Sequence, residues 1–220
     1  MAKGLHAVRK PVRAVDEARS IRDFWFGPLP MSGADFNQRM RFWFGDETSE
    51  MRRRRDAQIR RRFGELFARA AGGQLAAWAD GPRRRLSLII LLDQFPRNMF
   101  RGTARAFATD AQALALALSA MQSAADAALD VVERLFFYMP LQHAESREVQ
   151  DESVAAYRRL LSEATVELRP SFGACLRSAE NHRGIIERFG RFPYRNRVLG
   201  RPSTPQELEW LSKGGESFGQ

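Results

Sequence analysis

Apolar residues recur three and four positions apart along most of the chain, and glycine or proline separates these stretches. This spacing is the period of one face of an α-helix. No segment shows the period-two alternation of a half-buried strand. The pattern predicts helices over 15–26, 35–43, 48–71, 75–80, 83–93, 109–121, 126–139, 146–164, 171–189 and 204–211. We therefore expect an all-α fold.

The expected helices differ in how much of their circumference is apolar. The helix over 83–93 is apolar almost all round, which predicts a central and buried position. The helix over 48–71 has an apolar stripe through Ile59, Phe63 and Leu66, and arginines cover most of the remaining surface. Arginines spread around a helix are usually solvent-facing, so we interpret most of these as surface residues.

Short breaks between consecutive helices are typical of helical bundles and solenoids. No change in composition marks a domain boundary. We expect one helical domain over residues 14–212, with flexible ends at 1–13 and 213–220. Regular repeats of tetratricopeptide length are not legible in this chain.

Composition and charge limit the cellular location and the partners that we expect for the protein. The 220 residues carry a formal charge of +9 and one cysteine, Cys175, which excludes an intramolecular disulfide. The N-terminus lacks the apolar core of a secretory signal, and no apolar run is long enough to cross a bilayer. We therefore expect a soluble cytoplasmic protein without membrane partners. The charge would attract nucleic acid or anionic metabolites, but a solvated, arginine-rich surface explains it more simply.

One motif occurs twice. Phe-Pro-Arg-Asn at 95–98 returns, one residue longer, as Phe-Pro-Tyr-Arg-Asn at 192–196. Proline disfavours helical geometry in the residue before it, so we expect the first helix to end near Gln94 and a proline-locked turn to follow. Asp93 would then lie at the negative end of the helix dipole and need a cation. We expect Arg97, Arg101 or an arginine of the second copy to supply it.

The second copy lies among many arginines, Arg188, Arg191, Arg195, Arg197 and Arg201. Arginines and Asn196 on a rigid loop could bind phosphate or carboxylate through paired hydrogen bonds. Alternatively, they cap helix ends and pair with acids such as Glu187. The sequence leaves both interpretations open.

Two histidines belong to the expected domain. His182 shares an apolar helical stripe with Cys175, which favours a hydrogen-bonded core histidine over a general base. His143 follows Pro140, and Glu145 suits the entrance of the next helix. His and Glu two residues apart do not share a helix face, and no Walker, GxGxxG, GxSxG or CxxC motif occurs. We expect no metal and no cofactor.

Several long motifs occur in an order that resembles a bacterial family, domain of unknown function 924. They are ARSIRDFWFG, RFWFG, LSLIILLDQFPRNMFRGTARAFATD, FFYMPLQHAES and HRGIIERFGRFPYRNRVLGRPSTPQELEWL. The resemblance covers nearly everything from Val15 to Leu211. It implies an all-helical fold, an irregular superhelix or bundle similar to tetratricopeptide-type folds. It implies no activity, cofactor or catalytic residue.

The leading hypothesis is a protein that binds a small anionic ligand or an acidic peptide in a cleft between the two copies of the motif. A hydrolase or transferase with a histidine base and arginine stabilisation is the first alternative, and nucleic-acid binding through the arginine-rich surface is the second. Whether the protein is an enzyme, and its oligomeric state, stay open. The candidate ligand-binding residues are Asp93, Arg97, Asn98, His143, Glu145, His182, Arg191, Arg195 and Asn196.

Overall fold

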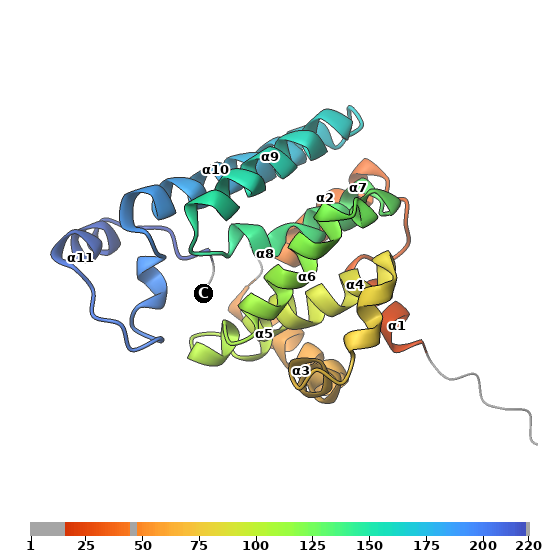
Figure 1. Cartoon of the computed structure of the whole chain (residues 1–220), viewed down its shortest axis with the longest axis horizontal. Helices are drawn as coiled ribbons and strands as arrows, with labels where there is room; N and C mark the ends of the chain where they lie inside the picture. The colour runs from red at the N-terminus through yellow and green to blue at the C-terminus, as the bar shows by residue number, and fades with distance from the viewer. Residues whose placement is uncertain (1–15, 45–47, 219–220) are drawn as a thin grey trace, which may run out of the picture.

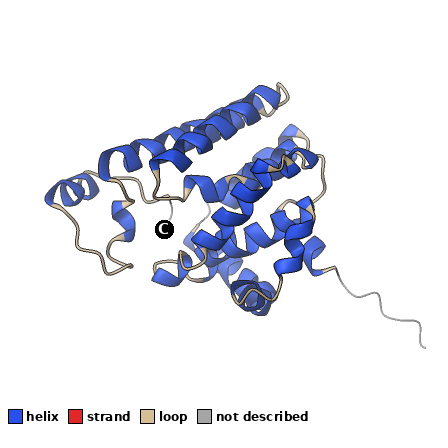
Figure 2. Cartoon of the chain, viewed as in Figure 1, coloured by secondary structure: helices blue, strands red, loops and turns tan. Residues whose placement is uncertain are grey.

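The computed structural model describes residues 16–44 and 48–218, and every regular element in these ranges is helical (Figures 1 and 2). The α-helices are α1 (Glu17–Trp25), α2 (Gly33–Phe44), α3 (Ser49–Ala71), α4 (Pro82–Ile89), α5 (Phe95–Met99), α6 (Asp110–Gln122), α7 (Val131–Phe137), α8 (Met139–Gln142), α9 (Arg147–Glu163), α10 (Arg169–Phe189) and α11 (Pro205–Ser212). The all-α prediction is confirmed.

Shorter helical turns connect these elements. Four are 3₁₀ turns, and one, η2, is π-helical; they are η1 (Ala76–Asp80), η2 (Ile90–Gln94), η3 (Ala104–Ala106), η4 (Ala125–Ala128) and η5 (Pro193–Arg195). The similarity to tetratricopeptide-type folds and the single domain over 14–212 stay predictions. The expected flexible end at 1–13 lies outside the described residues. No helix in the described part of the chain is long and apolar enough to cross a membrane.

Two groups of helices are arranged around α8. Figure 1 shows α9 and α10 side by side along one edge of the molecule, with α11 beyond the end of α10. The other group contains α1 to α7, with α4 in contact with α1, α6 and α7. The short helix α8 touches α6 and α7 as well as α9 and α10, and therefore joins the two groups.

The helix predicted to be central is indeed buried. Leu86 and every residue from Leu88 to Gln94 are nearly inaccessible to solvent. The aromatic residues of the two FWFG segments pack beside it, with Trp25 at 5.6 Å from Phe95 and Trp43 at 4.5 Å from Phe136 between ring centroids. These edge-to-face contacts anchor α1 and α2 in the core.

Predicted helix ends are confirmed where side-chain capping specifies them. Thr48 caps α3, Ser146 caps α9, and Gly72 ends α3. Thr204 and Glu207 form a capping box at the start of α11, with Pro205 in its first turn. The predicted helix over 126–139 is wrong in its first part: Leu129 is extended and a capping box of Asp130 and Glu133 starts α7 at Val131.

The prediction that the helix ends near Gln94 in a proline-locked turn is also wrong. The π-helical segment η2 runs directly into α5, and Pro96 lies in the first turn of α5. A proline inside a helix cannot donate to the carbonyl four residues earlier. That carbonyl belongs to Leu92, and the Thr109 hydroxyl donates to it instead. The widened π turn and this outside donor allow the chain to continue as a helix through the motif.

Candidate functional site

A pocket of about 410 Å³ lies where the two groups of helices meet. Its lining comes from α1, α2, α3, α5, α7, α8, α9 and α10, together with η2, η5 and the segment after α11. The residues that line it are Trp25, Met40, Trp43, Phe44, Arg52, Arg55, Gln94, Arg97, Asn98, Arg101, Leu135, Met139, Gln142, His143, Tyr157, Ala174, Cys175, Ser178, His182, Tyr194 and Phe218.

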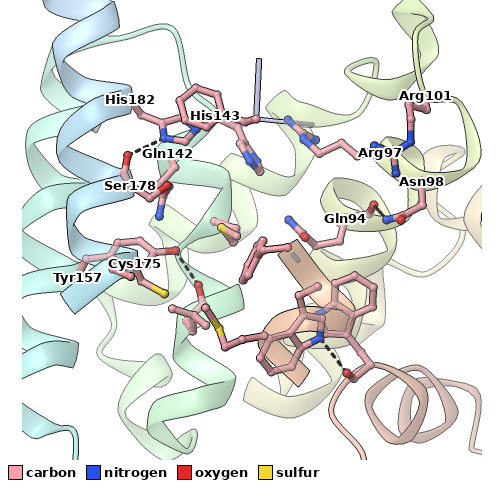
Figure 3. Close-up of a pocket in the computed structure, with 18 of the residues that line it drawn as sticks. Gln94, Arg97, Asn98, Arg101, Gln142, His143, Tyr157, Cys175, Ser178 and His182 are labelled. Atoms are coloured by element: carbon pink, nitrogen blue, oxygen red, sulfur yellow. Dashed lines mark hydrogen bonds between the residues drawn. The ribbon is translucent and has the colours of Figure 1, made fainter. Parts of the chain in front are cut away.

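The polar lining residues form two opposing walls. Figure 3 shows Gln94, Arg97, Asn98 and Arg101 on one side, in and next to α5. On the other side it shows four residues of α9 and α10, namely Tyr157, Cys175, Ser178 and His182. The side chains of Gln142 and His143, at the end of α8, lie between the walls. Guanidinium and amide donors therefore face a wall that carries an imidazole, a hydroxyl and a thiol.

An apolar surface accompanies these walls. It consists of aromatic and aliphatic side chains from α1, α2, α7 and α8: Trp25, Met40, Trp43, Phe44, Leu135 and Met139. Pockets for small molecules usually combine such an apolar lining with a few placed polar groups.

Among the described residues, the charged side chains that line the pocket are all arginines. Four arginines, Arg52, Arg55, Arg97 and Arg101, line the pocket, and no aspartate or glutamate does so among the residues that the structure describes. Asp56 pairs with Arg101 at 3.3 Å, but it is not part of the lining. The pocket therefore presents guanidinium N–H donors, and no carboxylate of a described residue, to whatever enters it.

A buried ion network lies behind the α5 wall. Asp93 is fully buried, and one of its carboxylate oxygens lies 3.2 Å from Arg97. Arg97 also donates to both carboxylate oxygens of Asp110, at 2.8 and 2.9 Å. Arg195 of the second copy reaches Asp110 at 3.4 Å. Asp110 therefore joins the two copies of the motif, which are far apart in sequence.

The network keeps Asp93 ionised. Burial by itself raises the pKa of the Asp93 carboxyl, but the charges of Arg97 and His143 and hydrogen bonds from His143 and Gln94 outweigh it. The resulting pKa lies well below the usual range for aspartate. Removing Arg97 would leave this charge buried without its nearest permanent cation.

His143 is attached directly to this carboxylate. Its Nδ1 lies 2.7 Å from Oδ1 of Asp93. Burial lowers the pKa of His143, and the charge of Arg97 lowers it further against the opposing effect of Asp93. A neutral imidazole bonded in this way carries its proton on Nδ1, which leaves Nε2 as a hydrogen-bond acceptor.

His182 is the buried, hydrogen-bonded histidine that the sequence predicts. Its Nδ1 donates to the Ser178 carbonyl at 2.7 Å, and burial lowers its pKa to about 3. It stacks against Phe218 at 3.7 Å between ring centroids and lies 6.2 Å from the ring of His143. His182 also lines the pocket, so it is not only a packing residue.

Two buried polar atoms of lining residues lack a hydrogen-bond partner within the described part of the chain. They are Nε2 of His182, an acceptor when Nδ1 carries the proton, and Nε1 of Trp25, a donor. Buried polar groups nearly always have partners in folded proteins. A bound molecule that offers both a donor and an acceptor would satisfy the two atoms.

The remaining predicted site residues belong to a separate cluster that holds η5 and α11. Arg191 pairs with Glu207 at 2.7 and 2.8 Å, and Asn196 donates to Glu207 at 3.2 Å. Glu145 accepts from Arg201 at 2.6 and 3.0 Å and from the Phe192 backbone at 2.8 Å. The arginines of the second copy thus pair with acids, but these are Glu207 and Glu145.

Four of the nine predicted site residues line the pocket: Arg97, Asn98, His143 and His182. Asp93 and Arg195 lie behind it in the ion network. Sequence reasoning missed Arg52, Arg55 and the aromatic lining. Arg52 and Arg55 are three residues apart and so share a helix face, but this spacing does not tell that the face meets a cavity.

Comparison with known proteins gives a family and a fold. The model of the family described as "Bacterial protein of unknown function (DUF924)" matches residues 21–215. A solved structure, that of the protein of unknown function ATU0120 from Agrobacterium tumefaciens, is 38% identical in sequence with a TM-score of 0.67. The similarity covers 90% of this chain and 97% of that one. No curated protein matches the chain significantly.

Proposed function

The chain belongs to the DUF924 family of bacterial proteins of unknown function, and from this premise we propose that its pocket binds a small organic anion with an apolar body. The observation that carries the proposal is the lining itself. Four arginines and no described carboxylate share it with an aromatic and aliphatic surface.

Each part of the lining selects a part of the ligand. Guanidinium groups bind carboxylate, phosphate and sulfonate oxygens through charge-assisted hydrogen bonds. Trp25, Trp43 and Phe44 gain from covering an apolar body, because that removes apolar surface from water. A small inorganic anion would leave this apolar surface exposed to water. The pocket therefore favours an amphipathic ligand.

The size of the pocket favours a small molecule over an acidic peptide. Its volume of about 410 Å³ lies in the lower part of the range for small-molecule sites. A peptide would need an open groove with room for several side chains. The acidic peptide thus becomes the weaker form of the same hypothesis.

Nucleic-acid binding receives less support. Many arginines of α3 already make contacts within the protein: Arg54 pairs with Glu50, Arg69 pairs with Glu17, and Arg60 donates to the Met99 carbonyl. Arg97 and Arg101 of the pocket are paired with acids too, so what separates the two hypotheses is the apolar lining of the pocket, to which phosphate groups offer no matching surface. A mobility-shift assay with single- and double-stranded DNA at about 50 mM salt tests this alternative directly.

The test of the proposed function compares three probes by isothermal titration calorimetry on the full chain. Naphthalenesulfonate carries both features, naphthalenesulfonamide has the body without the charge, and methanesulfonate has the charge without the body. We expect measurable binding of naphthalenesulfonate, weakened by salt, and much weaker binding of the other two. Equal binding of the charged and neutral naphthalene compounds would contradict the proposal.

A matched pair of variants locates the site. Arg52 lines the pocket, whereas its neighbour Arg53 is exposed on the same helix and does not. We expect Arg52→Ala to weaken naphthalenesulfonate binding about tenfold, the effect of losing a hydrogen bond to a charged group. Arg53→Ala removes the same charge and should leave affinity within about twofold. If both variants lose affinity equally, binding is non-specific surface attraction.

A further inference from the structure

The imidazole of His143 and the carboxylate of Asp93 are arranged as a base and the group that orients it. The two side chains meet at 2.7 Å through Nδ1 of the histidine. His143 lines the pocket, whereas Asp93 is fully buried behind it. A catalytic base needs a second group that fixes its tautomer and its direction, and a buried carboxylate on Nδ1 supplies both.

The carboxylate is itself held in place. Gln94 donates to Oδ2 of Asp93 at 2.5 Å, and Arg97 lies 3.2 Å from Oδ1. Arg97 is fixed in turn by Asp110. Asp93 is a positioning residue in this arrangement, because it acts through His143 and does not line the pocket.

The surroundings of His143 keep it in its basic form near neutral pH. The charged and titratable groups around it are Asp93, Arg97, Asp110, His182 and Arg195, the last of which donates to the His143 carbonyl at 3.1 Å. Burial and Arg97 lower the pKa of His143 from 6.5. The imidazole is therefore neutral at neutral pH and able to accept a proton. It becomes protonated, and loses this ability, only in more acidic solution.

Water is the best available nucleophile in the pocket. Burial raises the pKa of the Cys175 thiol to about 12, so no useful fraction is thiolate at neutral pH. The Ser178 hydroxyl is directed to Oε1 of Gln142, at 3.4 Å. Neither side chain contacts His143 in the way a nucleophile contacts its base.

We propose that the pocket hydrolyses an ester of the organic anion that it binds, with His143 as the general base. This inference rests on the proposed function. The buried Nε1 of Trp25 and Nε2 of His182 offer an unsatisfied donor and an unsatisfied acceptor. A carbonyl oxygen would accept from the first, and a hydroxyl group would donate to the second.

The reaction balances without a metal or a redox partner. Nε2 of His143 takes one proton from water as the water oxygen forms a bond to the ester carbonyl carbon. The tetrahedral intermediate then breaks its bond to the alcohol oxygen, which receives that proton back from His143. The products are an acid and an alcohol, and the arginines of the lining stabilise the negative charge that develops on the carbonyl oxygen.

The test uses the mono-para-nitrophenyl ester of succinic acid, an anionic ester with an apolar body. We expect the full-length protein to release para-nitrophenolate faster than buffer, and His143→Gln to lose about 100-fold or more of that rate. The wild-type rate, counted as para-nitrophenol plus para-nitrophenolate, should be level at neutral pH and fall only in more acidic solution, because the pKa of His143 is lowered, and this acid limb should be absent from His143→Gln.

Each outcome separates the two proposals. If the protein binds naphthalenesulfonate but releases no para-nitrophenolate above buffer, hydrolysis is overturned and anion binding stands. If it binds neither compound, the proposed function fails as well. Should His143→Gln not fold, the wild-type pH profile decides: a rate that follows hydroxide without the acid limb overturns the role of His143.

Discussion

The two copies of the Phe-Pro motif share their residues but neither their conformation nor their role. In the first copy, 95–98, the backbone is helical and two side chains, Arg97 and Asn98, line the pocket. In the second, 192–196, an extended Phe192 precedes the short turn η5. Tyr194 is its one member that lines the pocket, Arg195 joins the ion network behind the pocket, and Asn196 donates to Glu207 of α11. Similar residues thus form a wall of the pocket in one place and hold a neighbouring helix in the other.

The residue before each proline explains the different conformations. Phe192 has φ −89° and ψ 107°, the extended geometry that proline favours in its predecessor. Phe95 has φ −66° and ψ −38°, which is helical. It is held there because η2 leads into α5 and Thr109 satisfies the carbonyl that Pro96 cannot. The tertiary neighbour Thr109 overrides the local preference.

The two arginines also differ in what they neutralise. Arg97 contacts two carboxylates, one of them fully buried. Arg195 makes one ion pair at 3.4 Å and otherwise lies over the aromatic rings of Phe107, Phe192 and Tyr194, at 4.5 to 5.5 Å. The first arginine is needed for charge compensation, and the second mainly for packing.

The largest expected effect therefore comes from Arg97→Met. It leaves the buried Asp93 without its permanent cation, and we expect the free energy of unfolding to fall by about 3–5 kcal/mol. Arg195→Met keeps Arg97 on Asp110 and should lose only about 1–2 kcal/mol through its cation–π and hydrogen-bond contacts. Urea denaturation measures both values.

The exposed Arg105, which lies 3.9 Å above the ring of Phe100, provides the control for these changes. Arg105→Met should alter the free energy of unfolding by less than about 1 kcal/mol. Equal losses in Arg97→Met and Arg195→Met would remove the difference between the two copies.

Glu207→Gln tests the contacts of Arg191 and Asn196 with α11, and it should have the next largest effect on stability. Hydrogen bonds from Arg191, the Thr204 backbone and Asn196 outweigh burial and lower the pKa of Glu207 to about 2, with Arg191 the largest contributor. We expect a loss of about 1.5–3 kcal/mol at neutral pH. A depressed acid pKa stabilises the fold above the unfolded value near 4.5, and this stability disappears as the pH falls through about 2.

Denaturation curves at several pH values measure this dependence. The difference between wild type and Glu207→Gln should be full at pH 7 and shrink between about pH 4.5 and pH 2. Glu209 lies on the same helix, is exposed and pairs only with Lys213 at 2.6 Å. Glu209→Gln should change stability by less than about 1 kcal/mol at every pH. A pH-independent difference for Glu207→Gln would mean that its charge is irrelevant.

The smallest expected effect is also the sharpest comparison, because it uses the same residue type in both copies. Asn98 lines the pocket, whereas Asn196 donates to Ser203 and Glu207 away from it. We expect Asn98→Ala to weaken naphthalenesulfonate binding about fivefold, and Asn196→Ala to leave it unchanged. Calorimetric titration decides, and the reverse ranking would assign the ligand to the second copy.

Much of the candidate site could be anticipated from the sequence. The pairing of Asp93 with Arg97 and the burial of His182 both agree with the structure, although Asp93 needs its cation because it is buried and not because a helix ends at Gln94. The dyad of Asp93 and His143 could not be found in this way, because 50 residues separate the two side chains. Nor could the role of Arg52, since no rule of spacing says which of many arginines on one helix faces a cavity.

The sequence by itself determined the all-α class, the capped ends of α3, α9 and α11, and the burial of the central helix, since these depend on periodicity and on residues within one turn of each other. The tertiary structure decided the path of the chain through Pro96, the different roles of the two copies of the motif, and which residues line the pocket. Each of these depends on a partner far away in sequence, Thr109, Asp110 or Glu207. Such contacts form only when the helices pack, and for that reason two similar short motifs have different structures.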